Sequence, residues 1–185
     1  MQKAAFLDRD GVINVDKGYV YKIKDFEFIP GVFTAAQRLV QLGYRLIIVS
    51  NQSGIGKGYF KQADFDALMA WVTRQFAEHD VPLTAVYHCP YHPTEGLGEY
   101  RRQSVYRKPN PQMLLDAASE HQLDLQQSFI VGDKLSDLQA GRNAGLANGY
   151  LVKSPHNPTD AEREQFTAGL PVYTSLAEVV QKHYL

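Results

Sequence analysis

The sequence predicts a three-layer α/β fold, in which a Rossmann-like parallel sheet carries helices on both faces. Short apolar runs alternate with longer segments of helical period, the pattern of parallel strands joined by crossover helices. Apolar residues make up 44% of the chain and charged residues 21%, as in ordinary globular proteins. A chain of 185 residues can bury the core of one domain, so we expect a single domain over residues 1–185.

Six apolar runs rich in β-branched or aromatic residues are the predicted strands. We expect them at 4–8, 45–50, 85–89, 128–133, 149–152 and 171–174. Between them, two segments have apolar residues at i, i+3, i+4 and i+7, the spacing of one buried helix face. These residues are Val32, Ala35, Ala36, Leu39 and Val40 in the first segment, and Phe65, Leu68, Met69, Val72 and Phe76 in the second.

Capping signals predict two further helix starts. Asn110 followed by Pro111 is typical of an N-cap with proline at the first helical position, and Ser-Leu-Ala-Glu at 175–178 is a capping box. The polar stretch from Lys153 predicts a surface loop that leads into a solvated helix. No long insertion leaves room for a large cap domain, and the irregular segment 90–106 after the third strand is the candidate lid.

Charge and cysteine content narrow the function classes. Lys plus Arg number 19 and Asp plus Glu number 20, so the net charge of -1 would not draw the chain onto nucleic acid or an anionic membrane. The only cysteine, Cys89, excludes an internal disulfide and fits a reducing compartment. No apolar run approaches the roughly 18 residues of a membrane span, and aspartates interrupt any signal-peptide pattern. We expect a cytoplasmic monomer that acts on a small molecule.

Polar residues stand at the ends of three predicted strands. Residues two apart in an extended chain point the same way, so Asp8 and Asp10 project together beyond the first strand. Ser50 ends the second strand and Asp133 ends the fourth. Because the carboxyl ends of parallel strands meet at one edge of a sheet, we expect these side chains to lie together. Alone, the first pair could equally be solvated turn residues, but the matching positions of the others oppose that interpretation.

Carboxylates this close repel each other unless a cation lies between them. A cluster of Asp8, Asp10 and Asp133 therefore predicts a hard divalent ion, and Mg²⁺ suits an all-oxygen site that keeps several waters. The metal would also neutralise a phosphate, whose remaining oxygens Ser50 and Lys108 would hold. The glycines of residues 53–58 do not form a P-loop, because G-x-x-x-x-G-K-[ST] is not present, so we expect no nucleoside triphosphate site there.

Four motifs in this order resemble those of the haloacid-dehalogenase-like (HAD) phosphohydrolases, and together they are far more specific than any one of them. DRDGV at 8–12 resembles the first motif, Ser50 the second, Lys108 the third and GDKLSD at 132–137 the acidic fourth. The resemblance covers about residues 4–152. It implies a HAD-like sheet with a minimal cap.

The resemblance also implies a phosphatase that works through an aspartyl-phosphate intermediate. Asp8 would be the nucleophile. Asp10 would protonate the leaving oxygen and then deprotonate the attacking water. Ser50 and Lys108 would stabilise charge on the transferred phosphoryl oxygens. Mg²⁺ would be bound by the carboxylates of Asp8 and Asp133 and by the backbone carbonyl of Asp10.

Over nearly its full length, the chain is also similar to the heptose bisphosphate phosphatases of this superfamily, which act in the synthesis of lipopolysaccharide precursors. The stretches that carry this similarity are 8–20, 50–60, 87–93, 106–114 and 131–137. It implies hydrolysis of the 7-phosphate of a heptose 1,7-bisphosphate. The implied substrate contacts are Asp16, Lys17, Gly18, Tyr19, Asn51, Gln52, Ser53, Arg107 and Lys134. Asp137 would either support the metal ligands from behind or lie exposed on a helix.

The chain departs from that family at a structural zinc site in the loop after the third strand. Family members commonly hold this zinc with a C-x-H pair and a C-x-C pair, but the positions here are Cys89 and Tyr91, then Ser104 and Tyr106. Tetrahedral zinc needs four good nitrogen or sulfur donors, and three are missing. We expect no zinc, although two histidines beside Cys89 leave a rearranged site as the alternative. Packing of tyrosines with nearby prolines would then hold the loop, namely Tyr91, Tyr100 and Tyr106.

Other functions remain as alternatives. Histidinol-phosphate phosphatases have a similar core, but the sequence Asp-Lys-Gly-Tyr-Val at 16–20 favours the heptose substrate. A noncatalytic sugar-phosphate-binding protein would be favoured by loss of the nucleophile, yet Asp8 and Asp10 are both present. A nucleic-acid 3′-phosphatase would need a basic track, which the near-neutral charge does not provide.

Overall fold

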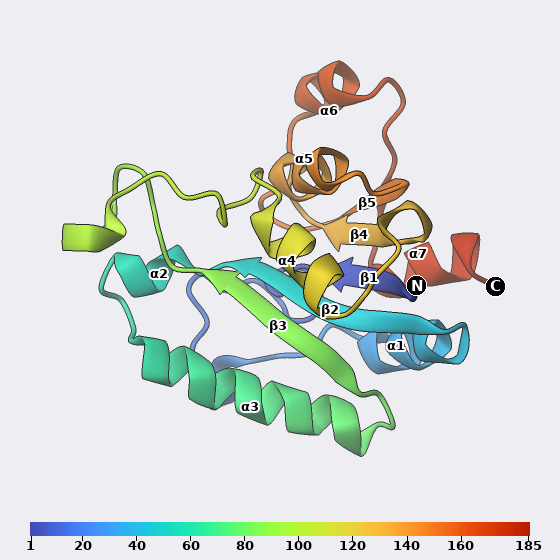
Figure 1. Ribbon diagram of the computed structural model, residues 1–185, viewed down its shortest axis with the longest axis horizontal. Coiled ribbons are helices and arrows are strands. Elements are labelled where there is room, and N and C mark those ends of the chain that lie inside the picture. Colours follow the sequence, from blue (N-terminus) through green and yellow to red (C-terminus); the bar gives the residue numbers. More distant parts are fainter.

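Six parallel strands form one sheet in the computed structural model, which describes residues 1–185 (Figure 1). The strand order is β3-β2-β1-β4-β5-β6, and all neighbouring strands pair in parallel. This confirms the predicted fold class and all six predicted strands. The bounds are β1 Lys3–Leu7, β2 Tyr44–Asn51, β3 Leu83–Cys89, β4 Phe129–Gly132, β5 Asn148–Val152 and β6 Val172–Tyr173.

Helices cover both faces of the sheet (Figure 1). The α-helices are α1 Val32–Gln41, α2 Ser53–Gly56, α3 Gln62–Glu78, α4 Gln112–Glu120, α5 Leu135–Ala144, α6 Asp160–Phe166 and α7 Leu176–His183. Short 3-10 turns lie at Ile23–Asp25 (η1), Gly98–Tyr100 (η2) and Leu125–Gln127 (η3). Alternate residues of β1 point to opposite faces: Ala5 and Leu7 join the core with α1, α3 and α7, whereas Ala4 and Phe6 join the core with α4 and α5.

The start of α4 differs from the prediction by one residue. Pro111 is the N-cap and the helix begins at Gln112, so Asn110 does not cap it. The Asn110 side chain instead donates a hydrogen bond from Nδ2 to the carbonyl oxygen of Ser104, at 2.8 Å. The asparagine therefore connects the helix start to the predicted lid.

The start of α7 lies where the sequence predicts it, but the capping hydrogen bonds differ. Ser175 is the N-cap residue, and its side chain makes no capping hydrogen bond. Glu178 accepts a hydrogen bond from the backbone N–H of Thr174 rather than from that of Ser175, with a distance of 2.6 Å to Oε2. The helix start is therefore predicted correctly, but the two hydrogen bonds of the predicted capping box are not formed.

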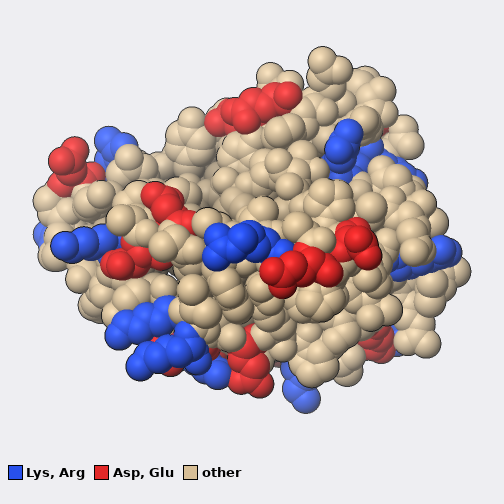
Figure 2. All heavy atoms as spheres, turned by 90° about the horizontal axis from the view of Figure 1, so that it is seen from below, with Lys and Arg blue, Asp and Glu red and all other residues tan.

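The strand order decides where the site lies. β1 is flanked by β2 and β4, so the residues that follow these three strands meet at one edge of the sheet. None of the helices combines the length and the apolar character that a membrane-spanning helix needs. On the face shown in Figure 2, Lys and Arg lie interspersed with Asp and Glu.

Candidate active site

A cavity of about 460 Å³ lies at this carboxyl edge of the sheet. Most of the residues predicted from the sequence line it, namely Asp8, Asp10, Asp16, Gly18, Tyr19, Asn51, Gln52, Ser53, Arg107, Lys108 and Lys134. Ser50 and Asp133 are buried next to these lining residues. Lys17 is not brought to the cavity, because its Nζ pairs with Glu27 Oε2 at 2.8 Å on the surface.

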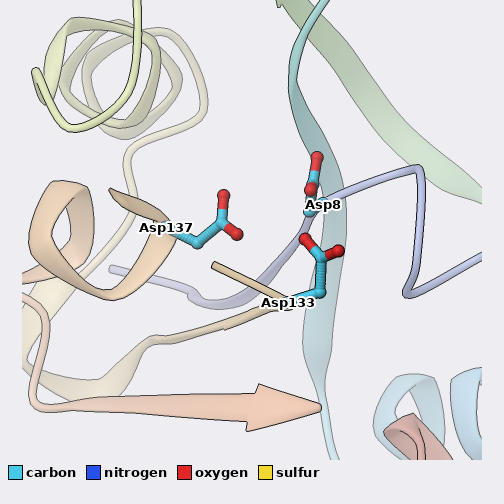
Figure 3. A group of neighbouring side chains, drawn as sticks. All are labelled: Asp8, Asp133 and Asp137. Atoms are coloured by element: carbon cyan, nitrogen blue, oxygen red, sulfur yellow. The ribbon is translucent and has the colours of Figure 1, made fainter. Parts of the chain in front are cut away.

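Three buried carboxylates converge at the cavity, whose wall includes Asp8 and Asp137 (Figure 3). Asp8 follows β1, Asp133 follows β4 and Asp137 lies in the first turn of α5, and one oxygen of each lies within 4.8 Å of the others. The carboxylate of Asp10 points elsewhere, so the predicted acidic cluster gains Asp137 in its place. Of the two alternatives for Asp137, exposure on a helix is wrong, because the residue is 1% exposed.

This group of carboxylates fits a divalent cation. Asp133 Oδ1 is buried and has no hydrogen-bond partner, which leaves an acceptor in need of a positive charge. Burial raises the pKa of Asp8 to about 7, an effect that the charge of Lys108 opposes and the neighbouring carboxylates reinforce. When ionised, the three carboxylates and the single ammonium of Lys108 leave two uncompensated negative charges. Mg²⁺ would compensate them with the oxygen ligands it prefers.

Lys108 is buried at the centre of these acids. Its Nζ lies 2.6 Å from Asp137 Oδ1 and 3.0 Å from Asp8 Oδ1, and it donates a hydrogen bond to the Val49 carbonyl at 2.8 Å. Burial favours the neutral amine, but the charges of Asp137 and Asp8 outweigh it and raise the pKa of Lys108. The side chain of Asn51 holds the Lys108 backbone through bonds of 3.1 and 3.0 Å. A fixed positive charge therefore stands beside the Asp8 carboxylate.

The carboxylate of Asp10 is held by three donors. Oδ1 accepts from Arg9 Nη2 at 2.8 Å and from Asn14 Nδ2 at 3.0 Å, and Oδ2 accepts from Gln52 Nε2 at 2.9 Å. Burial alone would raise the pKa of Asp10, but the Arg9 charge and these hydrogen bonds reverse the shift and lower it. Gln52 Nε2 also lies 2.8 Å from Ser50 Oγ, so this predicted substrate contact aligns two other site residues.

Backbone geometry allows Asp8 and Asp133 to come this close. Gly11 has a φ of 88°, in the left-handed region that favours glycine. A Cβ atom at this position would lie only 2.7 Å from Asp133 Oδ2. The glycine after the two aspartates therefore provides both the turn and the space for the neighbouring carboxylate.

The rim of the cavity is tied together by ion pairs and hydrogen bonds. Lys57 Nζ lies 3.0 Å from the Tyr19 hydroxyl and also pairs with Glu95, which connects the 16–19 segment to the 90–106 loop. On the other side, His156 Nε2 lies 3.0 Å from Asp16 Oδ2. The predicted sugar segment is thus held from two sides.

The sequence motifs did not reveal several residues that support the site. Ser154 Oγ donates to Asp133 Oδ2 at 2.6 Å, and Asn157 Nδ2 donates to the Asp133 carbonyl at 2.9 Å. With His156, they lie in the stretch predicted as a surface loop. Their position directly after the strand at 149–152 was the available signal, because that strand ends at the same edge of the sheet. Arg9 and Asn14 were also missed, and no local pattern marks them.

The surroundings of Cys89 differ from a metal centre. Asp8, Asp133 and Asp137 form the one group of three or more potential ligands close enough to share an ion, and Cys89 belongs to no such group. His88 Nε2 pairs with Gln62 Oε1 at 2.9 Å, and His92 Nδ1 accepts from the backbone of Glu95 at 3.0 Å. Both histidines therefore have other partners. The absence of zinc remains a prediction.

Two of the three tyrosines named for the 90–106 loop lie against other side chains of that loop. The rings of Tyr91 and Tyr100 lie 5.9 Å apart, and the Arg102 guanidinium lies 3.9 Å from the centre of the Tyr91 ring. Tyr106 is 40% exposed and forms no ring pair with the other two, and the packing of the three tyrosines with nearby prolines remains a prediction. Arg107 Nη1 donates to the Tyr91 carbonyl at 3.2 Å and brings the loop to the cavity.

Comparison with known proteins places this architecture in a family. The HAD-hydrolase-like family model matches residues 105–179. The chain is 43% identical over 181 residues, 98% of both chains, to D-glycero-beta-D-manno-heptose-1,7-bisphosphate 7-phosphatase of Pasteurella multocida. It is 49% identical over 150 residues, 81% of this chain and 79% of the relative, to D-glycero-alpha-D-manno-heptose-1,7-bisphosphate 7-phosphatase of Burkholderia mallei.

A solved structure agrees with the sequence relatives. The crystal structure of D,D-heptose 1,7-bisphosphate phosphatase from B. bronchiseptica, complexed with magnesium and phosphate, matches with a TM-score of 0.79 and 32% identity over 97% of both chains. A second crystal structure, of a putative HAD-like phosphatase from Mesorhizobium loti, matches with a TM-score of 0.78 and 41% identity over 86% of this chain and 76% of that chain. On this evidence, the chain belongs to the D-glycero-D-manno-heptose-1,7-bisphosphate 7-phosphatase family of HAD-like hydrolases.

Proposed function

We propose that this protein is a Mg²⁺-dependent phosphatase that removes the 7-phosphate of D-glycero-D-manno-heptose 1,7-bisphosphate, in the synthesis of lipopolysaccharide precursors. The observation that carries the chemistry is the buried Asp8 carboxylate, which lies beside the Lys108 ammonium and close to the carboxylates of Asp133 and Asp137. The named activity of the full-length relatives supports the substrate. The buried, unpaired Cys89 supports a cytoplasmic location, and we propose a monomer.

The carboxylates of Asp8 and Asp133 would hold Mg²⁺ together with the backbone carbonyl of Asp10. When bound, the ion would supply positive charge that offsets the repulsion of the phosphate by the nucleophile. Asp137 contributes through Lys108, which it holds in place, and Ser154 orients the Asp133 carboxylate.

In the first step, an Asp8 oxygen attacks phosphorus and the bond from phosphorus to the sugar oxygen breaks. Both contacts of the Asp8 carboxylate, from the Arg9 backbone N–H and from Lys108, fall on Oδ1, which leaves Oδ2 for the attack. The departing sugar oxygen takes a proton from Asp10. Lys108 and the Ser50 hydroxyl stabilise negative charge on the transferred phosphoryl oxygens.

In the second step, water attacks the aspartyl phosphate and gives its proton to the Asp10 carboxylate. The bond from phosphorus to the Asp8 oxygen breaks, which releases inorganic phosphate and restores both aspartates. Gln52 lies against both Asp10 and Ser50 and keeps their separation constant between the two steps. One carboxyl group thus serves as acid and then as base.

The sugar and its second phosphate occupy the rim. Asp16, Gly18 and Tyr19 approach the sugar from one side, and Arg107 and Lys134 provide positive charge for the phosphate that is retained. Asn51 and Ser53 complete the wall near the transferred phosphate. With no large cap domain, these short segments provide the substrate specificity.

The test is a substrate panel that includes heptose 1,7-bisphosphate and histidinol phosphate, assayed with Mg²⁺. We expect the highest kcat/KM for the heptose bisphosphate, with one equivalent of inorganic phosphate released and the anomeric phosphate retained in the product, as followed by ³¹P NMR. Faster hydrolysis of histidinol phosphate, or release of the anomeric phosphate, would overturn the proposal.

A further inference from the structure

Arg9, between the two motif aspartates, is the largest fully buried side chain in the protein. Taking a guanidinium out of water is unfavourable unless it gains partners of good geometry, and apolar residues often replace buried ion pairs without loss of stability. Nε and Nη1 of Arg9 have no hydrogen-bond partner. Packing alone therefore does not explain an arginine at this position.

One atom of Arg9 makes all of its side-chain hydrogen bonds. Nη2 lies 2.8 Å from Asp10 Oδ1 and 2.7 Å from the carbonyl oxygen of Val20. Val20 directly follows the segment whose residues Asp16, Gly18 and Tyr19 line the cavity. The same nitrogen thus connects the proton-transferring carboxylate to the end of the loop at the rim.

The aromatic surroundings restrict where this nitrogen can lie. The Arg9 guanidinium carbon lies 5.9 Å from the ring centres of both Phe26 and Phe65, within the range of cation–π attraction. A planar group held against two rings has little freedom to rotate. A lysine ammonium would keep the charge but not the flat fork that packs here.

We propose that Arg9 is a positioning residue: its Nη2 fixes the Asp10 carboxylate for proton transfer and makes that placement depend on the segment 16–20. This inference rests on the proposed role of Asp10 as the acid of the first step. It predicts that loss of Arg9 impairs protonation of the leaving oxygen more than attack by Asp8.

Comparing substrates with different leaving groups distinguishes loss of proton donation from a general loss of protein stability. A sugar alkoxide is a strong base and departs only as it receives the Asp10 proton, whereas p-nitrophenolate is stable enough to depart without one. Because kcat/KM reports steps up to departure of the leaving group, the ratio of kcat/KM for the two kinds of substrate isolates proton donation. Hydrolysis of the aspartyl phosphate is the same step for both substrates and comes after departure of the leaving group, so it does not affect this ratio.

The experiment compares Arg9→Met and Arg9→Lys with the wild type. We expect Arg9→Met to lower kcat/KM for heptose bisphosphate by about 10²-fold, with a much smaller loss for p-nitrophenyl phosphate, and Arg9→Lys to fall between. Phe76→Leu, a substitution in the same apolar core, is the matched control, and it should lower the melting temperature without changing the ratio of the two substrates. Equal losses for both substrates in the Arg9 variants, or no loss, would overturn the proposal.

The substrate-ratio test can still be carried out if Arg9→Met does not fold or if the natural substrate is another sugar phosphate. If Arg9→Met does not fold, Arg9→Lys keeps the buried charge and carries the same ratio test. If the wild type hydrolyses another sugar phosphate and not heptose bisphosphate, the proposed substrate fails, and that sugar phosphate replaces it in the ratio. A selective loss with the new substrate still supports the role of Arg9.

A double-mutant cycle tests the link to the loop. Gly18 has a φ of 77°, so Gly18→Ala strains the segment without a steric clash, since no atom lies within 4 Å of the added Cβ. We expect Gly18→Ala to lower kcat/KM for the sugar phosphate in the wild type and to have a smaller effect in Arg9→Lys, where the connection is already weakened. Additive effects would overturn the dependence on the loop.

Discussion

Lys108 Nζ lies 2.6 Å from Asp137 Oδ1, and both side chains are only 2% exposed. Each would be costly to bury alone, so the pair keeps a charged lysine beside the nucleophile and a third carboxylate beside the metal ligands. The catalytic aspartate is thus surrounded by charges whose removal has predictable effects.

Replacing Asp137 by asparagine removes one of the two uncompensated negative charges and weakens the hold on Lys108. We expect Asp137→Asn to raise the Mg²⁺ concentration for half-maximal activity by about tenfold or more. A Mg²⁺ titration of activity measures the effect. Asp160→Asn, on the exposed surface of α6, is the matched control and should behave like the wild type. An unchanged Mg²⁺ requirement would contradict this arrangement of charges.

Asp8→Asn should abolish turnover while the fold is retained, because an amide cannot form the acyl phosphate. The same change removes a buried charge that the other carboxylates repel, so we expect the metal-free variant to melt no lower than the metal-free wild type. Activity assays and thermal melts in EDTA check both parts. Near-normal turnover would refute the role of Asp8 as the nucleophile.

The stability of the metal-free protein should fall as pH rises. The pKa of Asp8 is about 7 in the folded state, mainly because of burial, against 3.8 for the exposed side chain. Between these values the folded state holds a proton that the unfolded state has lost, so this contribution is present at low pH and is lost as pH rises through the folded pKa.

Mg²⁺ should reverse this loss, because it replaces the proton. We therefore expect the rise in melting temperature on adding Mg²⁺ to be larger at a pH of about 8 than at about 5.5, and to shrink in Asp8→Asn. Thermal melts with and without Mg²⁺ at both pH values measure it. An increment that does not change with pH would show that Asp8 does not compete for protons in this way.

Ser154 should influence the metal without touching it. Its hydroxyl orients the Asp133 carboxylate, so Ser154→Ala should weaken Mg²⁺ binding by about tenfold. Isothermal titration with Mg²⁺ measures the change. Ser175→Ala is a suitable control, because the Ser175 side chain makes no capping hydrogen bond. Equal affinities in the wild type and in Ser154→Ala would remove Ser154 from the site.

Protein purified without added zinc should contain none in stoichiometric amount. Cys89 has no second cysteine to join it, and both neighbouring histidines have other partners. Elemental analysis decides the question, and activity after EDTA treatment should return with Mg²⁺ alone. About one tightly bound zinc per chain would instead indicate a rearranged site at the 90–106 loop.

The strands, the two apolar helix stripes and the edge at which the site forms could be predicted from the sequence. These features follow from short-range rules: apolar periodicity identifies a buried face, and parallel strands bring their carboxyl ends to the same edge. Asp8, Ser50 and Asp133 stand at or directly after the ends of strands, so parallel pairing of these strands brings them to the same edge.

The tertiary structure alone decided which partner each polar group has. The Asp10 carboxylate accepts hydrogen bonds from Arg9 and Gln52. The third carboxylate beside Asp8 and Asp133 is therefore that of Asp137, and not that of Asp10 as the sequence predicted. Ser154 contacts Asp133 from a stretch that the sequence predicts to be a surface loop. A hydroxyl or guanidinium group can form its hydrogen bonds with water or with many protein groups, and the local sequence does not indicate which partner it has. That choice depends on which groups the packed chain brings within about 3 Å and shields from water.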